Sequence, residues 1–266
     1  MKINQKTILA VASDFDGTLI KEGENNPSAL FYETLEKLLE NKIPFIAASG
    51  RQYSNLRRLL GPFADRVSYI AENGCLVVHQ GTVIHKSIFD RKIAMELIED
   101  MKKQPGTEIM VSGEDTSYLV SDNAAFIDML KNKIRHNTTL LQDYADIPED
   151  ILKISIYWKN GIPKEPEQWF HEKYDSRLKV ANGGNGWLDF NAFDSGKGEA
   201  LQILADHMGI PMTAIVAFGD NENDLSMLKK AGIGYAVASA KPHIKEKADS
   251  ICESVEEVLL HALHSL

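Results

Sequence analysis

The sequence contains only two cysteines, Cys75 and Cys252, among 266 residues. They are far apart along the chain, and each lies in an apolar stretch. Neither has the spacing of a metal site, so a cysteine-based metal centre is disfavoured. Two buried thiols in a reducing cytoplasm are the simplest interpretation, because a free thiol packs well among apolar groups and cytoplasmic disulfides are rare.

Long apolar runs and an excess of basic residues are also missing. No run approaches the length of a membrane span, and residues 1–7 are polar, unlike the apolar part of a secretory signal. The formal net charge of −9 argues against nucleic acid or an anionic membrane as the main partner. We therefore expect a cytoplasmic protein that binds neither nucleic acid nor a membrane.

What the sequence does have is length and an alternation of strands and helices. A chain of 266 residues exceeds one ordinary domain, and 44% hydrophobic residues are enough for a full core. Near both ends of the chain, apolar runs alternate with helical patterns, which is typical of a parallel, doubly wound α/β sheet. The expected strands of this sheet are residues 8–13, 43–48, 67–71, 214–218 and 234–237.

The middle of the chain has a different pattern. Its predicted strands and helices form β-β-α units, and one of the helices is expected over residues 123–133. We therefore predict a separate α/β insertion over residues 85–187, between a first core part at residues 1–84 and a second at residues 188–266. The predicted fold class is α/β, with a doubly wound, Rossmann-like core and an inserted α/β domain.

Two aspartates, Asp14 and Asp16, follow the first predicted strand, and Gly17 permits a sharp turn directly after them. The carboxyl ends of strands are the usual ligand sites of open α/β sheets. One carboxylate can attack phosphorus, a second can act as general acid and base, and together they can hold Mg²⁺. The alternative interpretation is an ordinary strand end with an Asp-Gly turn.

Two further positions could bind phosphate. Ser49 and Gly50 follow a predicted strand, where a hydroxyl and backbone N–H groups can hold a phosphate oxygen. The alternative is a Ser-Gly turn. Lys197 lies between two glycines at a predicted helix start, without the spacing of a Walker P-loop, and the alternative is a solvated lysine.

A last polar group follows the predicted strand at residues 214–218. It contains Asp220, Asn223 and Asp224, so carboxylates again gather at a strand's carboxyl end. A helix N-cap is the alternative, and Asp224 suits that role.

Together these groups resemble the four motifs of the haloacid dehalogenase-like superfamily. They read Asp-x-Asp-Gly-Thr at residues 14–18, Ser-Gly-Arg at 49–51, Lys197, and Gly-Asp-x-x-Asn-Asp at 219–224. The first and last look like those of the Cof-type phosphatases, which carry a large α/β cap. The resemblance covers the two flanking segments by motif and the insertion by position and size, and it implies that residues 85–187 form the cap.

The resemblance also implies roles. Asp14 would be the nucleophile, and Asp16 the general acid and then the base. The phosphoryl group would be bound by four residues: Ser49, Gly50, Lys197 and Asn223. Mg²⁺ would be held by a set of aspartates: Asp14, the main-chain carbonyl of Asp16, Asp220, and Asp224 in support. Four carboxylates against one lysine also call for a divalent cation on electrostatic grounds.

The expected activity is Mg²⁺-dependent hydrolysis of a small organophosphate, a sugar phosphate or related metabolite, through an aspartyl phosphate. The alternatives are a phosphomutase and a non-enzymatic phospho-acceptor domain. Asp16 argues against the acceptor domain, and also against dehalogenation, because the dehalogenases lack this second aspartate. Four features are left open between contact with the leaving group and a structural role: Arg51, Tyr53, Glu72 and the turn at residues 182–185.

Overall fold

The structure is a computed structural model that describes residues 1–264. These residues divide into two compact units, which are described separately. The core unit consists of Met1–Arg51, Leu56–His85 and the chain from Gly196 onward. The inserted unit consists of Gln52–Asn55 and Lys86–Ser195.

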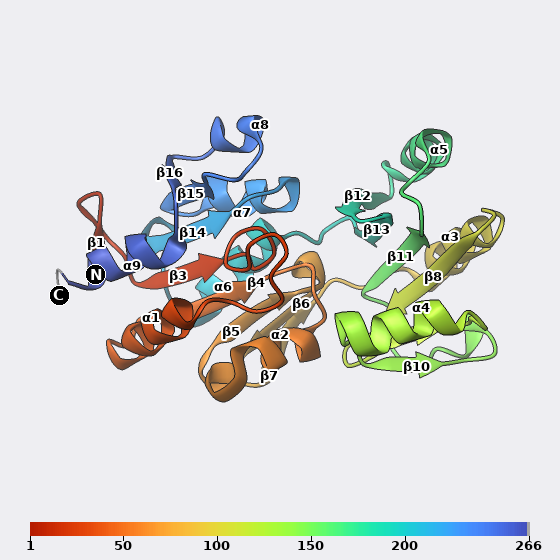
Figure 1. Ribbon diagram of the computed structural model, residues 1–266, viewed down its shortest axis with the longest axis horizontal. Helices are drawn as coiled ribbons and strands as arrows, with labels where there is room; N and C mark the ends of the chain where they lie inside the picture. Colours follow the sequence, from red (N-terminus) through yellow and green to blue (C-terminus); the bar gives the residue numbers. More distant parts are fainter. Residues whose placement is uncertain (265–266) are drawn as a thin grey trace. The chain divides into compact units, whose positions relative to one another are not determined.

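The core unit is built on an eight-stranded sheet in the order β16-β15-β14-β3-β4-β5-β6-β7 (Figure 1). The pairings from β16 to β5 are parallel, and β6 returns antiparallel to β5. Its central strands are fully buried, which explains their uninterrupted apolar sequence. The strands are β3 (Ala10–Ser13), β4 (Phe45–Ala48), β5 (Ser68–Ala71), β6 (Leu76–His79), β7 (Thr82–Lys86), β14 (Ile215–Gly219), β15 (Ile233–Val237) and β16 (Ser250–Cys252); a short hairpin, β1 (Lys2–Ile3) and β2 (Lys6–Thr7), precedes them.

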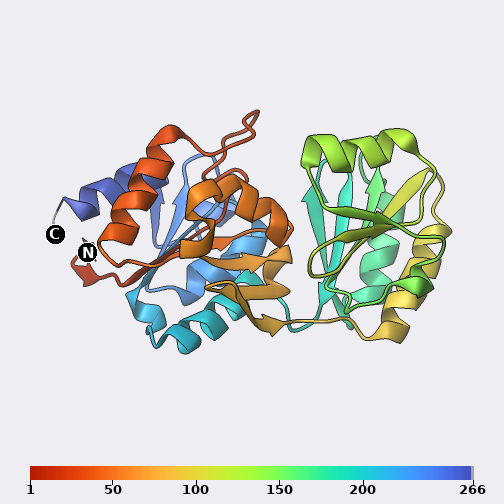
Figure 2. The ribbon, with the colours of Figure 1, turned by 90° about the horizontal axis from the view of Figure 1, so that it is seen from below.

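Helices cover both faces of this sheet, as Figure 2 shows for α1 and α9 on one face and α6 on the other. Ser28 caps α1 by accepting a hydrogen bond from the backbone N–H of Phe31 at 3.1 Å. The helices of the unit are α1 (Ala29–Glu40), α6 (Lys197–Met208), α7 (Leu225–Lys230), α8 (Pro242–Lys245), α9 (Val255–Leu263) and the larger part of α2 (Tyr53–Leu60), whose first three residues belong to the inserted unit. The predicted α/β fold with a doubly wound parallel sheet is confirmed.

The strand register brings three loops together at the carboxyl edge of the core sheet. Ser13, the last residue of β3, is paired with Phe218 of β14 on one side and with Ala47 of β4 on the other. The residues that follow these strands therefore start at adjacent points of one edge.

The inserted unit has its own six-stranded sheet, in the order β10-β9-β8-β11-β13-β12. Residues of β8 alternate between its faces: Ile109 and Val111 pack with α3 and α5, whereas Met110 packs with Phe126 of α4. The strands are β8 (Thr107–Ser112), β9 (Ser117–Leu119), β10 (Thr138–Leu140), β11 (Lys153–Trp158), β12 (Leu178–Gly184) and β13 (Trp187–Ala192), and the helices are α3 (Arg91–Lys102), α4 (Ala124–Asp128) and α5 (Lys164–Tyr174).

The inserted unit differs from its expected outline at three places. Strand β13 pairs with β11 and β12, so this unit extends to Ser195 rather than ending at residue 187. The helix expected over residues 123–133 is α4 followed by a π-helix at Met129–Ile134. The short, polar strand β10 was not expected, because a Thr-Thr-Leu segment carries no clear alternation.

The two cysteines are free thiols in the described residues. Cys75 and Cys252 are both buried, and neither forms a disulfide within residues 1–264. Burial raises the pKa of the Cys252 thiol to about 12. Among the described helices, none is both long enough and apolar enough to cross a bilayer.

Candidate active site

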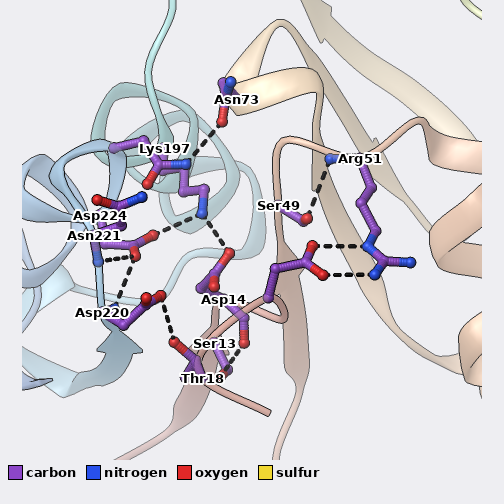
Figure 3. Close-up of polar contacts among 12 residues, drawn as sticks. Ser13, Asp14, Thr18, Ser49, Arg51, Asn73, Lys197, Asp220, Asn221 and Asp224 are labelled. Carbon is purple, nitrogen blue, oxygen red and sulfur yellow. Dashed lines mark hydrogen bonds and ion pairs between the residues drawn. The ribbon is translucent and has the colours of Figure 1, made fainter. Parts of the chain in front are cut away.

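The candidate site lies at the carboxyl edge of the core sheet (Figure 3). Asp14 follows β3, Ser49 follows β4, Asp220 follows β14, and Lys197 is the first residue of α6. All four predicted motifs belong to the core unit. Their residues are separated by up to about 200 positions in the sequence, and the parallel strands bring them together.

Lys197 joins two aspartates at the centre of the site. Its Nζ lies 2.6 Å from Oδ1 of Asp14 and 2.6 Å from Oδ1 of Asp224, and its side chain is fully buried. Burial alone would lower the pKa of Lys197, but the two carboxylates outweigh it and raise that pKa above the usual value. Lys197 is therefore a permanent positive charge at neutral pH, and the solvated-lysine interpretation is excluded.

The aspartates carry more negative charge than Lys197 can balance. Burial raises the pKa of Asp14 well above its usual value; Lys197 opposes this, and the neighbouring aspartates add to it. Burial and the charge of Asp224 raise the pKa of Asp220 to about 6. The negative charge on Asp14 and on Asp220 is therefore unfavourable in this site, and a further positive charge nearby would stabilise it.

The donor set fits a divalent cation. Carboxylate oxygens of Asp14, Asp220 and Asp224 all lie within 4.8 Å of one another. Oxygen donors at this spacing suit a hard ion such as Mg²⁺. The two oxygens of Asp224 already accept hydrogen bonds: Oδ1 from Lys197 at 2.6 Å, and Oδ2 from the backbone N–H groups of Asp220 at 3.0 Å and Asn221 at 3.1 Å. Asp14 and Asp220 are therefore the stronger candidates for direct ligands, with Asp224 supporting their loop.

Asp16 is turned toward a different partner. Its carboxylate accepts two hydrogen bonds from Arg51, at 2.7 Å from Nε and 2.5 Å from Nη2. Burial would lower the pKa of Arg51, but the hydrogen bond and charge of Asp16 raise it. The Asp16 side chain is half exposed, at 52%, so it is more accessible than the buried Asp14. A carboxylate in this position can exchange protons with solvent or with a bound molecule.

Ser49, Gly50 and Gly17 border the candidate site. The Ser49 side chain is buried, and its Oγ accepts a hydrogen bond from the backbone N–H of Arg51 at 3.1 Å. A Cβ at Gly50 would lie 2.9 Å from Oδ1 of Asn73, closer than side chains approach. Gly17 has φ +87°, and a Cβ there would overlap the Asp220 carboxylate. Gly17 therefore has a backbone conformation that favours glycine, and a side chain at position 50 would displace the Asn73 amide.

Two residues of the site were not predicted from the sequence. Thr18 donates from Oγ1 to Oδ1 of Asp220 at 3.2 Å, and Asn73 accepts from Nδ2 of Asn223 at 3.0 Å. Thr18 is part of the Asp-x-Asp-Gly-Thr motif, and Asn73 is the second residue after the end of β5, so position along the sequence was an available signal. Of the four features left open above, the structure places Arg51 on Asp16, Glu72 buried beside Asn73, and Tyr53 and the residue 182–185 turn in the inserted unit.

The sequence matches a family model described as haloacid dehalogenase-like hydrolase over residues 11–263. An Escherichia coli relative, 5-amino-6-(5-phospho-D-ribitylamino)uracil phosphatase YbjI, is 22% identical over 264 residues, covering 96% of this chain and 97% of the relative. The HMP-PP phosphatase of Citrobacter koseri is 26% identical over 250 residues, covering 88% and 85%.

Two solved structures match nearly the full length of this chain. A protein from Streptococcus mutans, 26% identical, superposes with a TM-score of 0.84 and covers 97% of this chain and 100% of that one. A sugar phosphatase of HAD subclass IIB is 21% identical, with a TM-score of 0.81 and coverage of 95% and 98%. The likeness to the second structure is one of fold.

Proposed function

The chain belongs to the haloacid dehalogenase-like hydrolases and is a phosphatase, and we propose that it hydrolyses the phosphomonoester of a small metabolite through an aspartyl phosphate on Asp14. The observation that carries the proposal is the buried Lys197, which is bonded to Asp14 and Asp224 at 2.6 Å each. A charge held there neutralises a phosphoryl group beside Asp14.

In the first half-reaction, a carboxylate oxygen of Asp14 attacks phosphorus. The new O–P bond forms while the bond from phosphorus to the leaving oxygen breaks, and Asp16 gives that oxygen a proton. In the second half-reaction, Asp16 takes a proton from the water that attacks the aspartyl phosphate, so inorganic phosphate leaves and Asp14 is restored. Asp16 suits both steps because its side chain is half exposed, and it must part from Arg51 to act.

Other residues bind and orient the phosphoryl group. The Ser49 hydroxyl, the Gly50 backbone N–H and the Asn223 amide are donors near Asp14 and Lys197, and phosphoryl transfer depends mainly on such positioning and charge neutralisation. Mg²⁺ would be held by Asp14, Asp220 and the main-chain carbonyl of Asp16, with Asp224 in support, and it would offset the charge that develops on the phosphoryl oxygens.

We propose a sugar phosphate or related metabolite as the substrate. The relatives support this class, because the E. coli protein is named for a phosphoribityl compound and the C. koseri protein for HMP-PP. The test is release of inorganic phosphate from a panel of phosphorylated metabolites and from p-nitrophenyl phosphate, in the presence of Mg²⁺. Failure to release phosphate from any of them would contradict the proposal, and return of the phosphoryl group to another position of a sugar would indicate a mutase.

We further propose that the inserted unit is the cap that selects the leaving group. The support is its separate sheet and core, since lids in other enzymes exclude water and complete a pocket. Replacing this unit by a short linker should leave some activity on p-nitrophenyl phosphate and poor discrimination among metabolites. Unchanged discrimination would place specificity in the core unit.

A further inference from the structure

Asn73 connects two loops of the active site that are far apart in the sequence. Its side-chain Oδ1 accepts a hydrogen bond from Nδ2 of Asn223 at 3.0 Å (Figure 3). Its backbone N–H donates to the carbonyl of Ser49 at 3.0 Å. Ser49 lies in the loop after β4, and Asn223 lies in the loop after β14. Asn73 is therefore hydrogen-bonded to both of these loops.

The backbone of this turn has an uncommon conformation. Glu72, Asn73 and Gly74 have φ values of +50°, +58° and +97°, all in the left-handed region. Such conformations persist where the surrounding structure determines them, and they cluster at functional sites. Here the N–H of Glu72 donates to the carbonyl of Arg51 at 3.1 Å, and Asn73 is bound to Ser49. Asparagine is among the residues that tolerate this region best.

The turn is also tightly packed against the phosphate-binding loops. A Cβ at Gly50 would meet Oδ1 of Asn73 at 2.9 Å, and a Cβ at Gly74 would overlap the backbone of Gly196, which precedes Lys197. The missing side chain at Gly50 leaves the space that the Asn73 oxygen occupies, and the hydrogen bond to this oxygen orients the Asn223 amide.

We infer that Asn73 is a positioning residue for phosphate binding, which acts by orienting the side-chain amide of Asn223. The bond to Asn73 uses one N–H of that amide, and within residues 1–264 the Asn223 side chain makes no other hydrogen bond. The second N–H is thereby presented to a phosphoryl oxygen. The inference rests on the proposed function, because it acts through the phosphate contact of Asn223.

A double-mutant cycle tests this coupling, with inorganic phosphate as a competitive inhibitor of p-nitrophenyl phosphate hydrolysis. Asn73→Gly removes the side chain and keeps the left-handed backbone, which glycine adopts readily. We expect Asn73→Gly and Asn223→Ala each to weaken phosphate inhibition about tenfold, the value of one good hydrogen bond. The double variant should be no weaker than Asn223→Ala alone. Gln80→Gly, at an exposed left-handed position (φ +48°) in the β6–β7 turn, is the matched control and should change nothing.

The outcomes distinguish the positioning role of Asn73 from the proposed function. Multiplying effects in the double variant, about a hundredfold in total, would show that Asn73 acts independently of Asn223 and would overturn the inference, while the proposed function stands. Unchanged inhibition in Asn223→Ala would instead remove the phosphate contact of Asn223 from the proposed function.

A spectroscopic measurement keeps the inference testable if Asn73→Gly does not fold. The side-chain NH₂ signals of Asn223 can be assigned by their loss in the NMR spectrum of Asn223→Ala. We expect one proton that exchanges slowly with water before phosphate is added, and a second proton that shifts when phosphate binds. Two rapidly exchanging protons in the phosphate-free protein would contradict the inference.

Discussion

Arg51 holds both carboxylate oxygens of Asp16, at 2.7 Å from Nε and 2.5 Å from Nη2. Planar, two-point contacts of this kind are among the stronger hydrogen-bonded ion pairs. The pair links the residue that we propose as general acid and base to the loop that carries Ser49. The acid–base residue and the phosphate-binding loop are therefore coupled before any substrate arrives.

Asp16→Asn should lower kcat by about 10²–10⁴-fold, the usual effect of losing a general acid–base group. With p-nitrophenyl phosphate, whose leaving group needs little protonation, the second half-reaction should suffer more, so the phosphoenzyme should accumulate. Rapid acid quench measures it as protein-bound phosphate. Arg51→Lys, which keeps the charge and loses the two-point contact, is the comparison and should cost about tenfold or less. Equal phosphoenzyme levels in wild type and Asp16→Asn would contradict the role of Asp16.

Asp14→Asn should abolish turnover, because a neutral amide is a poor nucleophile. The pKa of Asp14 is raised by burial and by its neighbours, so removing its charge should not lower the melting temperature of the metal-free protein. The measurements are steady-state phosphate release and a thermal melt. Asp206→Asn, exposed near the far end of α6, is the matched control. A near wild-type kcat for Asp14→Asn would overturn the mechanism.

Mg²⁺ should raise the melting temperature of the wild type by relieving the repulsion among Asp14, Asp220 and Asp224. Binding to the folded state alone contributes about 2.7 kcal/mol at a hundredfold excess over Kd. Asp220→Ala should melt at the same or a higher temperature without metal and gain little from Mg²⁺. Equal gains in the two proteins would show that Asp220 is not a ligand.

The same titration should depend on pH. The pKa of Asp220 in the folded, metal-free protein is raised to about 6, above its ordinary value. Protonation therefore stabilises that state as pH falls through about 6, and protons then compete with the metal. The Mg²⁺-induced shift in melting temperature should be larger at pH 7.5 than at pH 5. A shift that is independent of pH would contradict the metal role of this carboxylate.

Asp100→Asn should destabilise the inserted unit. Asp100 is 5% exposed; it accepts from Lys103 at 2.8 Å and from Tyr174 at 2.6 Å, and it is paired with Lys173. Burial would raise the pKa of Asp100, but these donors together lower it to about 2. Because the folded pKa lies below the unfolded one, the stabilisation is present above about pH 4 and is lost as pH falls toward 2.

The expected loss is about 2 kcal/mol at pH 7, measured as the free energy of unfolding, and it should shrink at pH 3. Glu99→Gln is the matched control, because Glu99 makes the same i,i+3 contact with Lys102 at 2.6 Å but is 63% exposed. Its effect should stay below about 0.5 kcal/mol. A loss for Asp100→Asn that is equally large at pH 3 would show that packing, rather than charge, is responsible.

The sequence by itself determined the core fold and the positions of its strand ends. Buried parallel strands such as β3 and β14 are uninterrupted apolar runs, and the polar residues after them stand out against that background. Parallel pairing then requires those strand ends to lie on one edge, so the meeting of Asp14, Ser49 and Asp220 was predictable from local patterns and topology.

Only the tertiary structure decided which side chains touch. Asn73 and Asn223 are separated by 150 positions, and nothing local marks them as a pair. The turn of Asp16 toward Arg51 depends on two side-chain conformations and on the spacing between β3 and β4. The membership of β13 in the inserted sheet follows from its pairing with β11, which competes with alternatives that look equivalent along the chain. The periodicity of apolar residues indicates which face of a helix or strand is buried. These contacts depend instead on how elements that are distant in sequence are placed relative to one another.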